Sequence, residues 1–214
     1  MVTLLLTFVP SILIGIYIIR SDKYPEPIDM LLGAFFLGFL LCLPAGILNE
    51  QLIFSRDKPN DFAFIAGITE ETLKFCAFMF YIRRRCEFDE PMDALVYGTL
   101  ISLGFATYEN YEYVYLYNEP FTSYEVAAIR AFSAIPLHAS CGIIMGFFIG
   151  KSLHFNDKTY LLSALLVPIS LHAFYNYLDN ILLTYSLITI AVVACLKLHN
   201  QAKVNQAMVN TENE

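Results

Sequence analysis

The chain has 214 residues, of which 57% are hydrophobic and only 15% are charged, and its mean hydropathy is +0.55. A soluble domain of this length would need more surface charge, so the composition indicates one domain that lies in a bilayer. The net charge of −7, and the lack of a basic run that would mark a nucleic-acid surface, exclude a nucleic-acid-binding protein. The five cysteines are scattered without a C-x-x-C pair, which argues against a disulfide framework or a cysteine zinc site.

Seven apolar segments are each long enough to cross a bilayer, which takes about 20 helical residues. They cover residues 3–19, 30–54, 61–82, 91–117, 125–150, 159–178 and 181–198, with short turn-forming connectors between them. We therefore predict an all-α polytopic membrane protein, a bundle of about seven transmembrane helices. Residues 1–198 would form a single transmembrane domain, and residues 199–214 a polar cytoplasmic tail that is frayed or disordered.

The basic residues predict how the chain is oriented in the membrane. The first segment ends in Arg20 and has no basic residue before it, as expected of an uncleaved first span. With the N-terminus outside, nine Lys and Arg residues fall at cytoplasmic ends of the segments and three at outer ends. Because cytoplasmic loops carry the excess of positive charge, the sequence predicts an N-out, C-in orientation.

Small residues recur every four positions in the segment 125–150. They are Ala134, Gly142, Gly146 and Gly150, and His138 lies on the same broad helix face. Small residues at this spacing let helices approach closely. We expect a helix-packing seam here, with His138 directed toward protein and away from lipid.

Polar residues inside the apolar segments carry the functional prediction, because a charge at the centre of a membrane helix costs about 2.5–3.5 kcal/mol and is retained mainly for function. They are Glu70, Glu71, Lys74, Glu109, Asn110, His138, His172 and Asn176. At a rise of about 1.5 Å per residue, the glutamates and histidines of four different segments fall in the outer half of the bilayer or near its midplane. We expect these side chains to line one polar cavity open to the outer face.

Helical spacing limits how these side chains can pair. Lys74 lies four residues after Glu70 and three after Glu71, so it can form an ion pair with either carboxylate. Adjacent side chains point about 100° apart, so one carboxylate can be tied to Lys74 while the other faces the cavity. A poorly solvated carboxylate with residual negative charge is a suitable general base for water. His172 and Asn176 share a helix face and could both donate hydrogen bonds to a developing oxyanion.

The same residues also fit other functions. Intramembrane Glu, His and Lys serve as relays in transporters, although the sequence shows no internal repeat of the kind that many transporters have. A non-catalytic scaffold or receptor could hold the charged residues as structural ties. Two glutamates and two histidines could form a zinc site, although His-Glu-x-x-His is absent and Lys74 would oppose a cation. Arg130 lies near a helix end, and we expect it to be interfacial.

Four ordered motifs resemble those of the PrsW family of membrane-embedded proteases, which is related to the CAAX prenyl endopeptidase/ABI superfamily of glutamate-dependent intramembrane proteases. The motifs are Glu70-Glu71-x-x-Lys74, Phe105-x-x-x-Glu109-Asn110, His138 and His172-x-x-x-Asn176, and the resemblance covers most of the chain except the tail. Glu109 stands where the CAAX endopeptidases have a histidine, and their Glu-Glu-x-x-x-Arg is here Glu-Glu-x-x-Lys. Both departures weaken the transfer of a prenylated substrate.

The resemblance implies a function. PrsW-like proteases make the first (site-1) cut in a single-pass anti-sigma factor on the extracytoplasmic side, after which a second protease acts and the sigma factor is released. Residues 1–198 would then be a protease domain in the cell membrane, surrounded by lipid, with its active site in the outer half of the bilayer. The expected partner is a single-pass membrane protein. No cofactor is expected, and zinc is the alternative.

The resemblance also implies roles for single residues. Glu70 would be the general base that activates water, with Glu71 and Lys74 as its immediate support. His138 would help to hold the water. The oxyanion would be stabilised by His172 and Asn176, and Glu109 with Asn110 would support the site.

Overall fold

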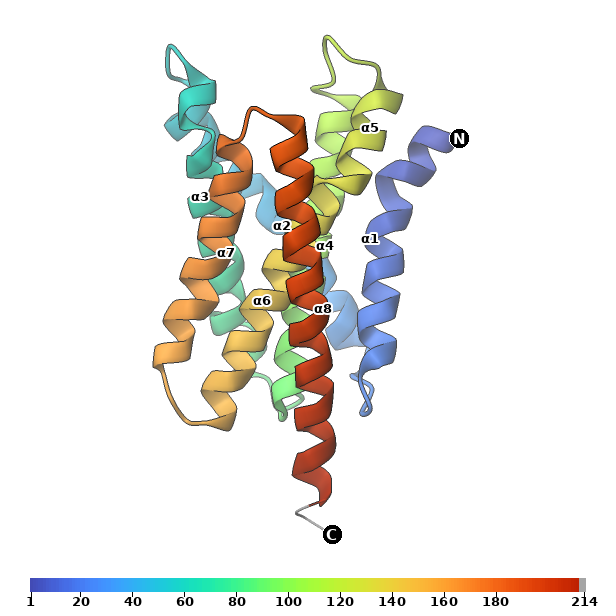
Figure 1. The fold of residues 1–214 in the computed structure, drawn as a ribbon, viewed down its shortest axis with the longest axis vertical. Helices are drawn as coiled ribbons and strands as arrows, with labels where there is room; N and C mark the ends of the chain where they lie inside the picture. The colour runs from blue at the N-terminus through green and yellow to red at the C-terminus, as the bar shows by residue number, and fades with distance from the viewer. Residues whose placement is uncertain (212–214) are drawn as a thin grey trace.

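The protein is a bundle of helices that run side by side along its long axis, as Figure 1 shows for the computed structural model. The structure describes residues 1–211, and the side chains of residues 1–206, and this part contains no β-strand. The α-helices are α1 (Val2–Ser21), α2 (Ile28–Asn49), α3 (Phe64–Phe80), α4 (Pro91–Tyr115), α5 (Ser123–Phe132), α6 (Ala134–His154), α7 (Thr159–Tyr177) and α8 (Ile181–Thr211). A π-helical turn (Glu50–Phe54) extends α2, and short 3₁₀ turns cover Pro59–Phe62 and Ile82–Arg84.

The predicted all-α membrane bundle is confirmed, with one break inside a predicted segment. Ser133 leaves helical geometry, with φ −128° and ψ −70°, and divides the segment 125–150 into α5 and α6. Its hydroxyl donates to the Ile129 carbonyl at 2.8 Å, a local bond that commonly bends a helix. The α-helices of the described residues therefore make seven passages along the bundle.

The apolar outer helices differ from those that carry the polar residues. Four stretches are long and apolar enough to cross a membrane, namely Val2–Ser21, Ile28–Phe54, Ser123–His154 and Ile181–Gln206. The first, second and fourth are mostly not buried inside the protein, whereas Ser123–His154 is mostly buried. α3, α4 and α7 hold glutamate or histidine in their interiors and are not among these four. α7 nevertheless also exposes apolar side chains, among them Leu162, Leu166 and Phe174, while its His172 is buried.

The small residues of α6 form the predicted packing seam, and α4 is the helix against which they pack. A Cβ atom added at Gly146 would lie 2.2 Å from the Ala94 carbonyl oxygen, and one at Gly142 would lie 2.6 Å from that of Gly98. Glycine is needed at both positions because any side chain would push the two helices apart. His138 lies on this buried side of α6 and is 1% exposed, as predicted.

The end of the chain differs from the frayed or disordered tail that the sequence predicts. α8 continues as one helix through Thr211, so this prediction is corrected for residues 199–211, while residues 212–214 lie outside the described residues. The helix persists because its polar side chains find partners on the body of the protein. His199 is buried, and its Nε2 atom lies 2.6 Å from the Ser21 hydroxyl at the end of α1.

Candidate active site

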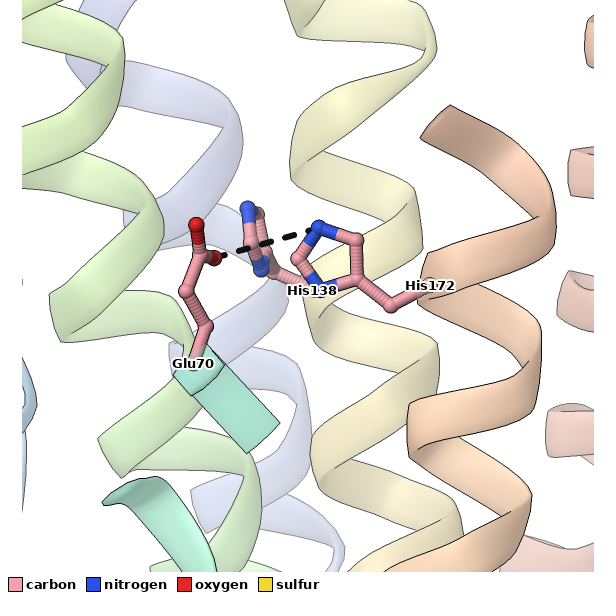
Figure 2. Close-up of side chains that lie close together, drawn as sticks. All are labelled: Glu70, His138 and His172. Atoms are coloured by element: carbon pink, nitrogen blue, oxygen red, sulfur yellow. Dashed lines mark ion pairs between the residues drawn. The ribbon is translucent and has the colours of Figure 1, made fainter. Parts of the chain in front are cut away.

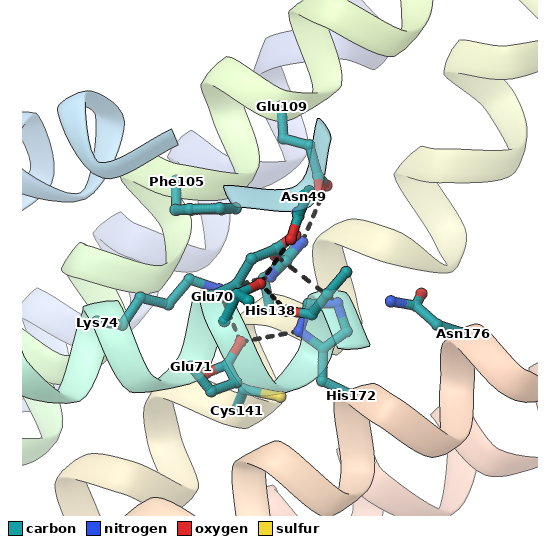
Figure 3. Close-up of polar contacts among 12 residues, drawn as sticks. Asn49, Glu70, Glu71, Lys74, Phe105, Glu109, His138, Cys141, His172 and Asn176 are labelled. Atoms are coloured by element: carbon teal, nitrogen blue, oxygen red, sulfur yellow. Dashed lines mark hydrogen bonds and ion pairs between the residues drawn. The ribbon is translucent and has the colours of Figure 1, made fainter. Parts of the chain in front are cut away.

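Charged side chains from four helices meet in the interior of the bundle. Glu70, Glu71 and Lys74 come from α3, and Figure 3 shows them grouped with Glu109 of α4, His138 of α6 and His172 of α7. Five of these six are at most 3% exposed, and the Glu109 side chain is 14% exposed. The structure thus brings together six of the eight residues that the sequence indicates. We call these six residues the catalytic cluster, after the role that the sequence predicts for them.

A close contact between α3 and α7 brings Glu71 and His172 together. A Cβ atom added at Gly67 would lie 2.4 Å from the backbone nitrogen of Ala173. The absence of a side chain at Gly67 lets the two helix backbones nearly touch. Glu71 follows one turn later and therefore faces His172, with 2.9 Å between Glu71 Oε1 and His172 Nδ1.

Lys74 forms its ion pair with Glu71, at 2.7 Å between Nζ and Oε1. The same ammonium lies 3.0 Å from Nδ1 of His138 and 4.1 Å from the centre of the Phe105 ring. These contacts replace the water shell that a buried ammonium would otherwise lose at high cost. Helical spacing alone would allow Lys74 to pair with either Glu70 or Glu71. Its contacts with His138 and Phe105, which lie on other helices, favour the pairing with Glu71.

Glu70 is the carboxylate with free acceptor capacity. Its Oε1 atom accepts a hydrogen bond from Asn49 Nδ2 at 3.1 Å, while Oε2 is buried and has no hydrogen-bond partner among the described residues. Figure 2 shows the carboxylate directed toward His172, with 3.8 Å between Glu70 Oε2 and His172 Nε2. This distance is too long for a direct hydrogen bond but suits one bridging atom.

Glu109 connects His138 to Arg130. Its Oε2 atom lies 3.0 Å from His138 Nε2 and also forms an ion pair with the Arg130 guanidinium. Arg130 Nε donates a second bond, to the Asn110 side-chain oxygen at 2.7 Å. The expectation that Arg130 is interfacial is therefore corrected. α5 ends at the Ser133 break and packs against α4, and the guanidinium turns inward to the Glu109 carboxylate.

The two predicted asparagines are not bonded directly to the glutamates or histidines of the catalytic cluster. Asn110 donates to the Thr7 carbonyl at 2.9 Å and so ties α4 to α1. Asn176 donates to the Ala63 carbonyl at 3.3 Å, and Figure 3 shows its amide apart from the His172 ring. Asn176 also lines a cavity of about 360 Å³ whose other walls come from α5 and α8.

Asn49 and Thr69 belong to the site although sequence reasoning did not select them. Asn49 binds Glu70, and its side-chain oxygen accepts a hydrogen bond from the Thr69 hydroxyl at 2.6 Å. The signal was present, because Asn49 is a polar residue inside the predicted span 30–54. Its partner lies on the next span, however, and the spacing along the chain does not identify it.

The formal charges of the site leave one negative charge in excess. Three glutamates face two cations, Lys74 and Arg130, when both histidines are neutral. Unbalanced charge in a buried region is costly, so one further positive charge is expected there. A proton on Glu70 or His172, or a bound cation, would supply it.

A polytopic helical bundle with a buried cluster of glutamates and histidines has the side chains that a membrane-embedded hydrolase needs to activate water inside the bilayer. Comparison with known proteins specifies the class further. The family model described as PrsW family intramembrane metalloprotease matches residues 26–197. The chain belongs to the PrsW family and is an intramembrane protease.

Several curated relatives share most of the chain. Protease PrsW of Oceanobacillus iheyensis is 34% identical over 209 residues, which cover 94% of each protein. Protease PrsW of Bacillus subtilis is 35% identical over 178 residues, 79% of this chain and 78% of the relative. Protease PrsW of Geobacillus kaustophilus is 34% identical over 177 residues, 79% of this chain and 76% of the relative. No solved structure is significantly similar to the chain.

The family description names a metalloprotease, and the cluster can be tested for its fit to a metal. Glu70, His138 and His172 each offer one ligand atom, and these atoms lie within 4.8 Å of one another. Both nitrogens of His138 are already engaged, Nδ1 with the Lys74 ammonium at 3.0 Å and Nε2 with Glu109 at 3.0 Å. A catalytic zinc needs three protein ligands with free lone pairs. As arranged, these side chains do not fit a three-ligand zinc site.

A second group of possible ligands shares the same difficulty. Glu71, Cys141 and His172 also place ligand atoms within 4.8 Å of one another. In this group Glu71 Oε1 already receives the Lys74 ammonium and lies 2.9 Å from His172 Nδ1. The Cys141 thiol donates to the Pro168 carbonyl at 3.7 Å. Lys74 therefore contacts one donor atom of each group, His138 Nδ1 in the first and Glu71 Oε1 in the second, that a metal would require to be free.

Proposed function

We propose that this intramembrane protease cleaves its substrate with a water molecule that Glu70 activates. The observation that supports this most strongly is the buried, unpartnered Oε2 atom of Glu70, 3.8 Å from Nε2 of His172. A water placed between these atoms would donate one hydrogen bond to each and keep a lone pair free for attack. Glu70 would take the proton as the new C–O bond forms, and it would pass that proton to the leaving amine as the C–N bond breaks.

Glu71 and Lys74 would hold His172 in the orientation that this step needs. Glu71 is ion-paired with Lys74, so it acts as an acceptor, and Nδ1 of His172 would carry the proton that faces it. The lone pair of Nε2 then points toward Glu70 and can accept from water. Positioning of this kind is a large part of enzymatic rate enhancement.

The oxyanion role predicted for His172 and Asn176 stays a prediction. In the orientation just described, Nε2 of His172 accepts from water, so it would donate to the oxyanion only after it has gained a proton. The Asn176 amide would have to leave the Ala63 carbonyl, to which it donates at 3.3 Å. Its place on the wall of the 360 Å³ cavity supports a role near the substrate.

The proposed substrate is a single-pass membrane protein, an anti-sigma factor, which this protease would cut first on the extracytoplasmic side of the cell membrane. The support is the resemblance of the four motifs to PrsW-like proteases, together with the depth of the catalytic cluster. Glu70 lies about 9 Å along α3 from Phe64, the end predicted to face outside, and about 15 Å from Phe80. An active site in the outer half of a multi-pass protein would suit such a cut.

The test uses the full chain, purified in detergent or reconstituted, with a single-pass substrate whose fragments are identified by mass spectrometry. Glu70→Gln keeps the size of the side chain and a carbonyl oxygen for Asn49 but cannot act as a base. We expect it to lower cleavage by a factor of about 10²–10⁴. Glu50→Gln is the matched control, because Glu50 is an exposed glutamate at the end of α2 that faces outside in the predicted orientation.

Two results would contradict the proposal. Cleavage by Glu70→Gln at the wild-type rate would remove Glu70 from the reaction. Fragments that end on the cytoplasmic side of the substrate would contradict the site-1 assignment while leaving the protease activity itself unaffected.

A zinc-dependent protease that uses the same residues is the second candidate. The observation that favours it is the distance limit of 4.8 Å among the ligand atoms of Glu70, His138 and His172. It would require Lys74 to leave His138, so activity would depend on zinc and on a rearranged lysine.

A further inference from the structure

A second group of acidic residues lies at one end of the bundle, the end that holds the connector between α1 and α2 and the beginning of α4 (Figure 1). Asp22, Glu26 and Asp93 each place a carboxylate oxygen within 4.8 Å of the other two. Glu90 joins them through Gln206 of α8, whose amide nitrogen lies 2.8 Å from Asp22 Oδ1 and 2.6 Å from Glu90 Oε1. We call Asp22, Glu26, Glu90 and Asp93 the acidic cluster.

Two carboxylates of the acidic cluster are buried and only half satisfied. Asp93 is 0% exposed, and its Oδ2 atom accepts from the backbone N–H groups of Asp89 and Glu90 at 2.9 and 2.8 Å. Asp22 is 8% exposed, and its Oδ1 atom accepts from the Tyr24 N–H at 3.0 Å. Their other oxygens, Asp93 Oδ1 and Asp22 Oδ2, are buried and have no hydrogen-bond partner in the part of the chain that the structure describes. Buried acceptors without a donor are costly, so a ligand for these oxygens is expected.

The chain supplies no cation for this charge within the described residues. None of the ion pairs found there involves Asp22, Glu26, Glu90 or Asp93. The Tyr97 hydroxyl donates to Glu26, but it is a neutral donor. The acidic cluster is therefore electrostatically unbalanced unless a positive ion or protons enter it.

We propose that the acidic cluster is a binding site for a divalent cation of the Ca²⁺ or Mg²⁺ class, held by Asp22, Glu26 and Asp93. Such hard cations prefer carboxylate oxygens, and two oxygens bound to one Ca²⁺ can be at most about 4.8 Å apart, twice a bond length of about 2.4 Å. The spacing of the three carboxylates meets this limit without any movement of the backbone. Glu26 is half-buried, so water can reach the site and complete the coordination shell.

The cation would fasten the cytoplasmic end of the bundle. It would join the α1–α2 connector to the first turn of α4, next to the place where Gln206 of α8 contacts both Asp22 and Glu90. Asp93 and Glu109 lie on the same helix, sixteen residues apart (93 to 109), which corresponds to about 24 Å along its axis. The proposed ion is thus separate from the catalytic cluster and takes no part in the cleavage step.

The experiment measures Mn²⁺ binding to the purified full chain by electron paramagnetic resonance, in a detergent without charged groups. We expect one Mn²⁺ per chain, displaced by Ca²⁺ or Mg²⁺, and the more effective of the two identifies the preferred ion. Glu26→Gln and Asp93→Asn should each weaken the binding at least tenfold. Asp29→Asn should leave it unchanged, because Asp29 is an exposed acid at the same end and lies outside the acidic cluster.

The outcomes separate this site from the active site. Absence of saturable Mn²⁺ binding, or equal affinity in Glu26→Gln and the wild type, would overturn the proposal. Loss of binding in Glu70→Gln alone would assign the ion to the catalytic cluster and would also overturn it. If Asp93→Asn does not fold, Glu26→Gln decides the question, because Glu26 lies in a connector and is only half-buried.

Discussion

The catalytic cluster and the acidic cluster treat buried negative charge in opposite ways. In the catalytic cluster, Glu71 is paired with Lys74 and Glu109 with Arg130, both cations of the same chain. In the acidic cluster, four carboxylates have no cationic partner among the described residues. The catalytic cluster lies inside the bundle, and the acidic cluster lies at its end. In the interior, where ions from solution have poor access, the chain thus supplies most of the counter-charge itself. At the end of the bundle, where ions can enter, it leaves the counter-charge to the proposed cation.

The largest expected effect comes from removing the interior cation. Lys74→Met leaves Glu71 buried without its partner, which we expect to destabilise the protein by about 3–5 kcal/mol and to abolish cleavage. Thermal unfolding in detergent and the cleavage rate measure the two effects. The double variant Lys74→Met/Glu71→Gln should regain most of the stability and none of the activity. Wild-type stability of the single variant would show that the ion pair does not balance the interior charge.

A smaller effect is expected from the helix contact that positions the catalytic cluster. Gly67→Ala would place a methyl group 2.4 Å from the Ala173 nitrogen, so α3 and α7 must separate. We expect a loss of about 1–3 kcal/mol in stability and a fall in cleavage rate of up to about 10²-fold. Gly46→Ala is the control, since a Cβ atom there meets nothing within 4 Å. Equal activity of the two variants would show that the α3–α7 distance is not critical.

The response to divalent cations should depend on pH. Burial raises the pKa of Glu90 from 4.5 to about 7, so between these values the folded protein retains a proton that the unfolded chain has released. Without divalent cations, stability should therefore fall as pH rises from about 4.5 to about 7. Cation binding requires ionised carboxylates, so the stabilisation by Ca²⁺ should grow over the same range. The titratable groups that face Glu90 are Asp93, Asp22 and Asp89.

Thermal midpoints with and without Ca²⁺ at pH 5.5 and pH 8 measure this effect. Ca²⁺ at ten times its dissociation constant should add about 1.4 kcal/mol at the higher pH and less at the lower. The Glu26→Gln variant is the control and should show little increment at either pH. An increment that is the same at both values would contradict the assignment to carboxylates.

The smallest expected effect is a change in stability that has the opposite sign in the two clusters. Glu90→Gln removes one negative charge from an unbalanced cluster and keeps the oxygen that accepts from Gln206. In a chelating buffer it should raise stability, by an amount on the order of 0.5 kcal/mol, because a like-charge repulsion is lost. In the catalytic cluster, removing the charge of Lys74 lowers stability instead. A destabilised Glu90→Gln variant would show that the acidic cluster is balanced by a partner in the chain.

Much of the catalytic cluster can be predicted from the sequence, because charge is rare in membrane helices. The cost of burying Glu70, Glu71 or Lys74 in an apolar segment is enough to mark these residues as functional candidates. The choice between Glu70 and Glu71 as the partner of Lys74 cannot be predicted in this way. Both lie within reach along the helix, and the contacts with His138 and Phe105, from other helices, decide it.

Other features depend on contacts between distant parts of the chain. Arg130 turns inward because the helix breaks at Ser133, and a single polar residue in an apolar segment does not predict that break. The acidic cluster combines Asp22 with Asp93 and Gln206. Hydropathy assigns Asp22 to a connector, Asp93 to a helix end and Gln206 to the tail, so it does not indicate that they are neighbours. Patterns within one segment predict its helix and its unusual residues, whereas the partners require the packing of the whole bundle.

The most direct test of the proposed mechanism is the cleavage rate of the purified protein after zinc and other transition metals are removed, in a buffer that keeps Ca²⁺ and Mg²⁺. Activation of water by Glu70 predicts an unchanged rate when the zinc content is far below one ion per chain. A rate that falls with zinc removal and returns with one added zinc per chain would contradict it, and would place a metal where Lys74 now contacts His138.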